Sequence, residues 1–291
     1  MRALVLGGTG SIGSSVVSAL VSRRHEVVAL ARSGSAAERL TAQGAQPLPG
    51  DLRAPEVWAH AAASVDAIIQ VAGDFTTDAA TIGRKLITTL LHRLTAGRRA
   101  PLPAYVYTGG CWLYGATGDR VATEESPLDA PAEWRWSIEQ LRMVLGASQV
   151  RGIVIHPAMV YARDGGVLAQ FHQDLLTLGR VRIFGDARVR WPMVHRSDIG
   201  DLYALALERG RPGASYNGAA VDSITVGALA RAMARRAGAP AEPLVRPIEE
   251  AVAELGDWAR GYAIDQRMSG AKARRELGWS PAHTDPIADI S

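Results

Sequence analysis

The chain has 291 residues, of which 47% are hydrophobic, enough to fill the core of one large α/β domain or of a nucleotide-binding domain with a smaller partner. Its 32 lysines and arginines nearly balance its 29 acidic residues and form no basic stripe, which argues against nucleic acid as a partner. The single Cys111 excludes an intrachain disulfide and a cysteine metal cluster, the dispersed histidines show no metal-ligand spacing, and no apolar run approaches the ~18 residues of a membrane span.

The first predicted elements are a strand, a glycine-rich turn and a helix. Residues 4–13 read LVLGGTGSIG, and the apolar residues that follow are spaced to share one face of a helix. In such a turn the first glycine allows the tight bend, the second lets a pyrophosphate approach and the third lets the helix pack on the strand. The helix N-terminus then offers free N–H groups to phosphate. The pattern predicts a dinucleotide site formed by Gly7, Thr9, Gly10, Ser11, Ile12 and Gly13.

The second predicted strand, Glu26–Leu30, is followed by Arg32. NAD-binding versions of this unit carry an Asp or Glu about 20 residues after the glycine turn, which accepts a hydrogen bond from the ribose 2′-hydroxyl. No acidic residue lies between Val27 and Ala37. A guanidinium suits a 2′-phosphate, so we expect NADP(H) to be preferred over NAD(H). The alternative is a solvated arginine at a strand end.

Strand and helix patterns continue to alternate through the first half of the chain. The longest helix-like stretch runs from about Thr77 to Thr95, and the further strand candidates are Ala45–Leu48, Ala67–Val71, Ala104–Thr108 and Gly152–His156. This alternation predicts an α/β fold with a doubly wound parallel sheet, a Rossmann fold. We expect a dinucleotide-binding domain over residues 1–160 and a smaller, dependent substrate-side region over 161–291.

Taken together, these blocks resemble the extended short-chain dehydrogenase/reductase family, also called the NAD-dependent epimerase/dehydratase family. The likeness adds GDL at 50–52, QVAG at 70–73, YVYT at 105–108, HPAMVY at 156–161, VHRSD at 194–198 and LGWSP at 277–281. The resemblance implies that Asp51 and Leu52 flank the adenine and that Val71, Ala72 and Gly73 line the ribose and diphosphate. It also implies that Pro157, Ala158, Met159 and Val160 lie near the nicotinamide, although Asp51 can equally be a turn residue.

The chain departs from the family at its catalytic pair. The family relies on Tyr-x-x-x-Lys in the helix after the fifth strand, assisted by a Ser or Thr at the end of that strand. Alignment on Ser137 and Glu139 places Trp134 at the tyrosine, Ile138 at the lysine and Gly110 at the Ser or Thr. Neither Trp134 nor Ile138 can move a proton, so the chain resembles the atypical members of the family.

Several other residues are candidates for the missing roles. Tyr114, Thr108, Cys111 and His195 are catalytic candidates, each with the alternative of a packing or capping residue. The expected substrate-binding residues are Trp112, Trp134, Tyr161, Arg190 and Trp191. Arg190 is included because it lies near the position of the phosphate-binding arginine of nucleotide-sugar members. The tryptophans indicate an aromatic pocket, unless they belong to the core or surface.

Three functions are consistent with these features. The first is an NADP(H)-dependent oxidoreductase that acts on a small, fairly apolar carbonyl compound with a non-standard proton donor. The second is a non-redox isomerase, cyclase or lyase, and the third is a catalytically inactive NADP(H)-sensing protein. We expect a cytoplasmic protein with a small-molecule substrate, no metal and no membrane partner. Helices over Thr77–Thr95 and Ala132–Ala147 can form a homodimer of the kind common among the family.

Overall fold

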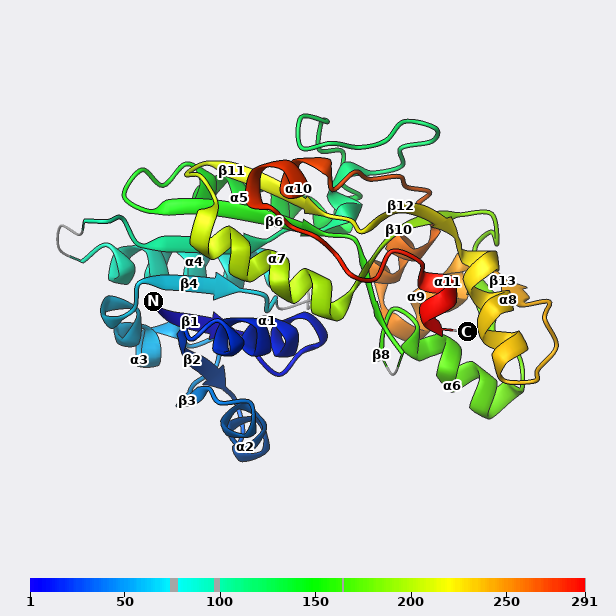
Figure 1. The fold of residues 1–291 in the computed structure, drawn as a ribbon, viewed down its shortest axis with the longest axis horizontal. Coiled ribbons are helices and arrows are strands. Elements are labelled where there is room, and N and C mark those ends of the chain that lie inside the picture. Colours follow the sequence, from blue (N-terminus) through cyan, green and yellow to red (C-terminus); the bar gives the residue numbers. More distant parts are fainter. Residues whose placement is uncertain (74–77, 97–99, 164, 291) are drawn as a thin grey trace.

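The computed structural model describes the chain except for residues 74–77, 97–99, 164 and 291. Within the described residues a seven-stranded parallel sheet has the order β11-β6-β5-β4-β1-β2-β3 (Figure 1). Its strands are β1 (Arg2–Leu6), β2 (Glu26–Ala31), β3 (Gln46–Pro49), β4 (Ala67–Gln70), β5 (Ala104–Thr108), β6 (Arg151–Pro157) and β11 (Ala214–Gly218).

Helices cover both faces of this sheet because its central strands are apolar on both sides. In β1, Ala3 and Val5 pack into one core and Leu4 and Leu6 into the other, and all four are fully buried. The first core includes residues of α1 (Ser11–Ser22), α2 (Gly34–Ala42) and α7 (Arg196–Arg209). The second includes residues of α3 (Pro55–Trp58), α4 (Ala79–Leu94) and α5 (Arg135–Leu145). The predicted doubly wound α/β fold is confirmed.

The rest of the chain forms a smaller body beyond the carboxyl ends of the strands, at the right of Figure 1. A four-stranded sheet there has the order β12-β10-β7-β8, and β9 pairs with β13. These strands are β7 (Met159–Ala162), β8 (Gly165–Gly166), β9 (Arg182–Phe184), β10 (Arg190–His195), β12 (Val221–Thr225) and β13 (Leu244–Arg246). The helices of this part and of the C-terminal segment are α6 (Ala169–Leu178), α8 (Val226–Arg236), α9 (Ile248–Leu255), α10 (Ala271–Leu277) and α11 (Pro286–Ile290). Short 3₁₀ helices cover Ala59–Ser64, Cys111–Tyr114, Ala132–Trp134 and Asp257–Ala263.

The chain passes between the two parts more than once. After β10 it returns with α7, which packs on α1, and with β11, which extends the large sheet beside β6. The C-terminal segment runs from α10, beside β11, to α11, beside α8. Residues after 160 therefore complete the large sheet as well as forming the smaller body.

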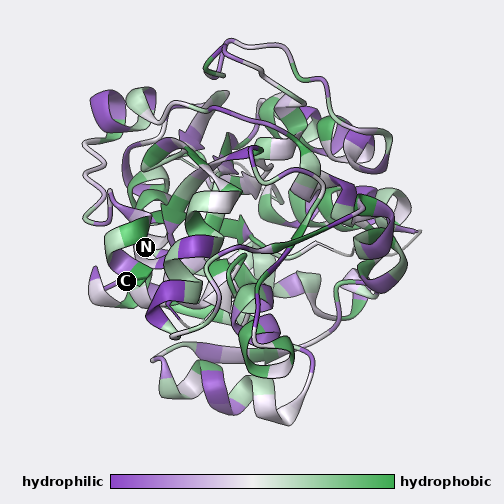
Figure 2. Cartoon of the chain, turned by 90° about the vertical axis from the view of Figure 1, so that its right-hand side faces the viewer, coloured by the Kyte–Doolittle hydropathy of each residue, from purple (hydrophilic) through white to green (hydrophobic). Residues whose placement is uncertain are grey.

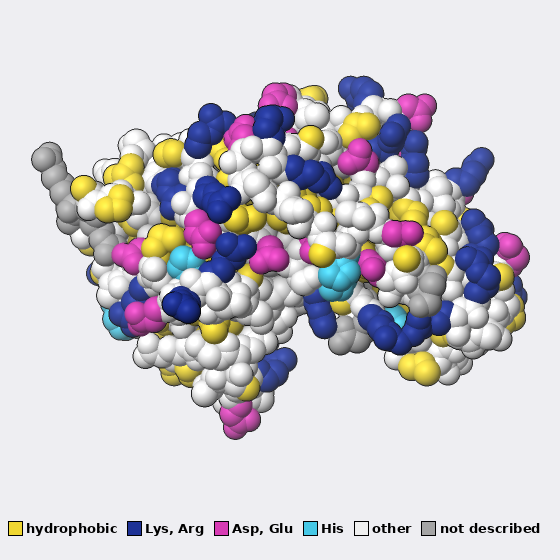
Figure 3. Space-filling model, viewed as in Figure 1, with side chains coloured by type: hydrophobic (Ala, Val, Ile, Leu, Met, Phe, Trp, Pro, Cys, Tyr) yellow, Lys and Arg dark blue, Asp and Glu magenta, His cyan; other side chains and the backbone are white. Residues whose placement is uncertain are grey.

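The placement of apolar and charged residues agrees with what the composition predicts. Apolar residues concentrate in the strands and inner helix faces, and hydrophilic ones in the loops and outer faces (Figure 2). On the face shown in Figure 3, basic side chains are dispersed among acidic ones. None of the helices in the described ranges is long and apolar enough to cross a membrane.

Candidate functional site

The glycine turn between β1 and α1 has the geometry that the sequence predicts. Gly7 has φ +92°, a left-handed conformation that favours glycine, and a Cβ there would lie 2.8 Å from Ala72 Cβ. A Cβ on Gly13 would lie 1.9 Å from the Gly7 carbonyl oxygen. The Gly10 N–H donates to that same oxygen at 3.0 Å. Gly7 and Gly13 therefore let the turn close, and Gly10 lines the cleft above it.

This turn forms one end of a cleft of about 520 Å³ at the carboxyl ends of β1, β2 and β4. The lining includes Gly7, Thr9 and Gly10 from the turn, Asp51 and Leu52 after β3, and Val71 to Gly73 after β4. Arg32, Ser33 and Arg39 lie on the β2–α2 side. An open parallel sheet binds its ligand at this edge. The backbone N–H groups of the glycine turn and the start of α1 suit the phosphates of a dinucleotide.

Local hydrogen bonds fix the residues at the far end of the cleft. Ser33 caps α2 by accepting from the Ala36 N–H at 3.2 Å. The carboxylate of Asp51 accepts from the Arg53 N–H at 2.9 Å, and the Trp58 indole donates to the Asp51 carbonyl at 2.7 Å. These bonds hold Asp51 in a turn, and the Asp51 side chain still lines the cleft.

A second cavity, of about 450 Å³, continues from the first and shares Leu52, Val71, Ala72 and Gly73 with it. Ser11 and Ile12 line it from α1, and Pro157 to Val160 from β6 and β7. The residues in its described lining include no Asp, Glu, Lys, Arg or His. Such a cavity favours a neutral ligand over a diphosphate-linked one, because an unpaired charge is costly to bury away from water.

One wall of the second cavity is aromatic. The rings of Trp112 and Trp134 meet edge to face with centroids 5.1 Å apart, and Trp112 stacks on Trp258 at 6.3 Å. Tyr262 lies edge-on to Trp112 at 5.7 Å, and Trp136 stacks on Trp134 at 6.4 Å. The rings come from three short segments of the chain, residues 111–114, 132–136 and 257–263.

The floor of this cavity carries polar side chains that bond to one another. The Tyr107 phenol donates to Gln140 Oε1 at 3.0 Å, and burial raises the pKa of Tyr107 to about 12. The Thr108 hydroxyl lies 2.7 Å from the Gln70 carbonyl oxygen and 2.6 Å from the Tyr203 hydroxyl. Burial also raises the pKa of Tyr203, so both phenols stay protonated at neutral pH.

Only some of the catalytic candidates reach this cavity. Thr108 and Cys111 line it, but burial raises the pKa of the Cys111 thiol to about 12, so it is not a ready nucleophile. Tyr114 is buried outside the described lining, and its phenol donates to Asn217 Oδ1 at 2.8 Å. Burial raises the pKa of Tyr114 as well. Tyr114 therefore faces the protein interior, which gives no support to its role as an acid.

His195 also lies away from the cavity. Its imidazole accepts from the Ser197 N–H at 3.3 Å and caps α7, and it stacks on His283 with ring centroids 3.8 Å apart. Burial, with repulsion from His283, lowers the pKa of His195. Asp198, in the first turn of α7, accepts from the N–H groups of Ala282 and His283 and anchors the C-terminal segment.

The substrate-binding candidates divide in the same way. Trp112 and Trp134 line the cavity, whereas Tyr161 donates to the Asp289 carboxylate near the C-terminus and Trp191 lies behind Tyr262, whose carbonyl accepts its indole N–H at 3.0 Å. Ile138, at the expected lysine position, is buried in the core between the sheet and α4.

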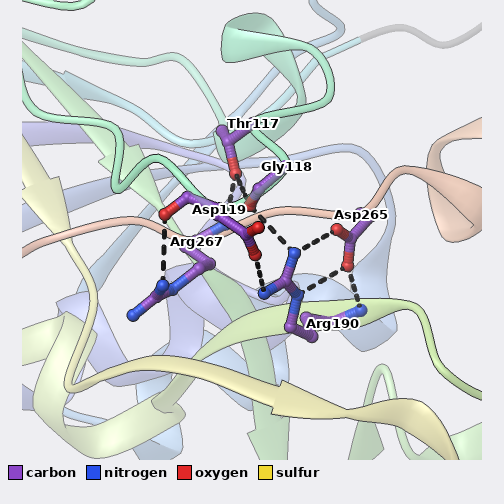
Figure 4. Close-up of polar contacts among 6 residues, drawn as sticks. All are labelled: Thr117, Gly118, Asp119, Arg190, Asp265 and Arg267. Atoms are coloured by element: carbon purple, nitrogen blue, oxygen red, sulfur yellow. Dashed lines mark hydrogen bonds and ion pairs between the residues drawn. The ribbon is translucent and has the colours of Figure 1, made fainter.

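Arg190 lies outside both cavities and is held by acidic partners (Figure 4). Its guanidinium donates to Asp265 at 2.6 and 2.9 Å, to Asp119 at 3.2 Å and to the Gly118 carbonyl at 2.9 Å. The Asp265 and Asp119 carboxylates raise the pKa of Arg190 further. The geometry makes Arg190 a clamp between β10, the 117–119 loop and the segment before α10, which leaves no support for phosphate binding.

Many residues of the second cavity's lining were not among the candidates named from the sequence, and Tyr107, Gln140, Trp258 and Tyr262 are four of them. Tyr107 directly precedes Thr108 at the end of β5, and its position beside a named candidate was the available signal. Gln140 follows Ser137 by three residues, one helical turn. Trp258 and Tyr262 come from a short helix far along the chain, and nothing in their local sequence links them to Trp112.

Comparisons with known proteins agree with this architecture. Residues 3–219 match the model of the NAD dependent epimerase/dehydratase family, and the chain belongs to that family.

Several curated relatives span nearly the whole chain. An uncharacterised protein of Schizosaccharomyces pombe, C2A9.02, is 27% identical and covers 100% of this chain and 98% of its own length. A 4-hydroxy-2-methyl-3-oxo-4-farnesyl-3,4-dihydroquinoline-1-oxide ketoreductase of Stigmatella aurantiaca is 26% identical over 96% of this chain and 92% of its own length.

Among solved structures, the human epimerase family protein SDR39U1 with NADPH has a TM-score of 0.78 at 21% identity, covering 100% of this chain and 98% of that one. This likeness shows that the two chains share a fold.

Proposed function

We propose that this protein is an NADP(H)-dependent oxidoreductase that acts on a small, neutral and fairly apolar carbonyl compound. The observation that carries the proposal is the uncharged aromatic cavity that continues directly from the dinucleotide cleft. The S. aurantiaca relative, named a ketoreductase, supports a carbonyl substrate.

The residues of the cleft fit a dinucleotide. Gly7, Thr9 and Gly10 with the start of α1 would hold the diphosphate, because a Cβ at Gly7 or Gly13 would close this turn against its neighbours. Asp51 and Leu52 would flank the adenine, and Val71 to Gly73 the ribose and diphosphate. Ser11, Ile12 and the four residues from Pro157 to Val160 would lie at the nicotinamide, whose reduced form supplies a hydride when bound.

The 2′-phosphate is assigned to Arg32. Its exposed guanidinium lines the cleft on the β2–α2 side, where Arg39 and the α2 cap Ser33 also lie. A phosphate there gains charge-assisted hydrogen bonds and the N-terminal end of a helix dipole. The NADPH-bound human relative of the same fold is consistent with this assignment.

Thr108 is the side chain best placed to bind the substrate oxygen. It lies at the end of β5 on the cavity lining, and the Tyr203 phenol behind it is 2.6 Å away. With Tyr203 as donor to Thr108 Oγ1, the Thr108 proton is free to turn from the Gln70 carbonyl to a substrate oxygen. In the reducing direction Thr108 would give its proton to the substrate oxygen and take a proton back from water in the open cavity, while the buried Tyr203 stays protonated and donates to Thr108 Oγ1.

Cofactor choice is tested by measuring the dissociation constants of NADPH and NADH by calorimetry. We expect NADPH to bind more tightly and the Arg32→Ala variant to lose that preference, whereas Arg188→Ala, at an exposed residue outside the cleft lining, keeps it. Equal affinities in the wild-type protein would contradict the assignment of Arg32.

Turnover is tested with NADPH and a panel of ketones and enones. Thr108→Val should lower kcat by about a hundredfold, within the usual range for a lost proton donor, and Thr108→Ser should restore most of it. Tight NADPH binding without turnover of any compound would instead support the NADP(H)-sensing or non-redox alternatives, which the missing Tyr-Lys pair favours.

A further inference from the structure

We propose that the second cavity selects a neutral, planar aromatic carbonyl compound, held by ring contacts with Trp112, Trp134 and Trp258. This inference rests on the proposed function, because it names the substrate class for the same cavity. Three features of the cavity lead to it: the aromatic wall, the satisfied polar floor and the absence of charge in the described lining.

The aromatic wall offers ring faces and edges from several directions. Trp134 meets Trp112 edge to face at an interplanar angle of 63°, while Trp258 lies nearly parallel to Trp112 at 29°. Tyr262 stands at 89° to Trp112, so the half-buried rings of the wall lie at several angles to one another. Aromatic rings prefer stacked and T-shaped arrangements, and each pair adds attraction beyond the buried area alone. A saturated ring of the same size gains only the burial of its surface.

Packing from outside keeps the wall rigid. A Cβ on Gly261 would lie 2.4 Å from the Trp112 ring, so the glycine lets this backbone rest directly on the indole. The Trp136 indole donates to the Glu133 carbonyl at 2.8 Å, and Trp191 supports Tyr262 through a hydrogen bond to its carbonyl. Preformed ring positions lower the entropic cost of binding a rigid, flat ligand.

The floor argues against a ligand with many hydroxyl groups. Gln70 accepts from the Tyr105 phenol at 2.6 Å, Gln140 accepts from Tyr107, and the Thr108 hydroxyl already has two oxygen neighbours. The buried Trp112 indole N–H is a donor without a partner among the described residues, but a sugar has more polar groups than this one donor and Thr108 can satisfy and would have to break the floor's bonds, whereas a single carbonyl would not. The floor therefore fits a mostly apolar ring system with few polar atoms.

Charge separates an aromatic substrate from a cationic one. Aromatic cages also bind quaternary ammonium groups through cation–π attraction. A buried cation is most stable with a nearby carboxylate, and the described lining of this cavity has none. We therefore assign the cavity to a neutral ring.

The test compares the binding of 2-acetylnaphthalene with that of its decahydro counterpart by calorimetry, in the presence of saturating NADP⁺. We expect the aromatic ketone to bind about tenfold more tightly, as two aromatic contacts imply. Trp134→Leu should reduce the ratio to about threefold or less, and the matched Trp134→Phe should keep it. Trp258→Leu, in a separate element, gives the same readout if Trp134→Leu does not fold.

Equal binding of the two ketones, or an unchanged ratio in both leucine variants, would overturn the inference. Tighter binding of phenyltrimethylammonium than of tert-butylbenzene would overturn it in favour of a cation. Because the assay measures binding, an aromatic preference without turnover refutes only the proposed oxidoreductase. Reduction of aliphatic ketones without an aromatic preference refutes only this inference.

Discussion

Gly83, in the second turn of α4, allows a direct test of the cavity floor. An Ala at an interior helix position is normally more stable than Gly by about 1 kcal/mol. A Cβ on Gly83, however, would lie 2.2 Å from Nε2 and 2.4 Å from Oε1 of Gln140. Gln140 is buried and accepts from the Tyr107 phenol, so it cannot move aside without breaking that bond.

The gain in helix propensity and the clash with Gln140 change the free energy of unfolding in opposite directions, and their sizes decide whether Gly83→Ala stabilises the protein. Loss of the buried Tyr107–Gln140 hydrogen bond costs about 1 kcal/mol, and the overpacking adds about 1–3 kcal/mol. After the gain in helix propensity, Gly83→Ala should lower the free energy of unfolding by roughly 1–3 kcal/mol. In a Gln140→Ala background the clash is removed, and the same change should raise the free energy of unfolding by about 0.5–1 kcal/mol.

Urea unfolding of the four proteins in this double-mutant cycle measures both quantities. The sign reversal between the two backgrounds is the decisive result. If Gly83→Ala is as stable as the wild-type protein, or destabilises it equally when Gln140 is Ala, the contact between these residues is not what requires a glycine.

Two titratable groups give further predictions. Burial raises the pKa of Cys111 to about 12, so the native thiol should react with a disulfide reagent at pH 8 at least about a hundredfold more slowly than in the urea-unfolded chain; equal rates would contradict its burial. Burial lowers the pKa of His156 from 6.5 to about 4, so the unfolded state takes up a proton first and the free energy of unfolding should fall as the pH drops from about 6.5 to about 4. His156→Asn should flatten that slope, the exposed His92→Asn should not, and identical slopes in all three proteins would refute the assignment.

The large sheet was predictable because its strands are short apolar runs bounded by turns. Each of the six strands expected from the sequence is present within a residue or two, and the long helix expected at Thr77–Thr95 is α4 in its described part. The strand β11 was not expected, because Ala-Ser-Tyr-Asn-Gly has no apolar run and becomes a strand only by pairing with β6.

The site was predictable only where it is contiguous in the sequence. Local geometry alone brings the glycine turn to the dinucleotide cleft and the 157–160 segment to the second cavity. The aromatic wall joins residues more than a hundred positions apart, and no local pattern links Trp112 to Trp258. The position of Arg190 in the sequence indicated a phosphate site, but its guanidinium is bonded to Asp265. The sequence could not show this pairing, because Asp265 lies 75 residues away.

The return of the chain to β11 affects how this protein can be divided. A fragment that stops at residue 160 lacks β11 and α7, so β6 becomes an edge strand with unpaired N–H and C=O groups and the outer face of α1 loses its cover. Exposed apolar edges of this kind pair with other chains and promote aggregation. The nucleotide-binding half therefore depends on residues that come after position 160, and proteins made for binding studies should keep the chain through α10.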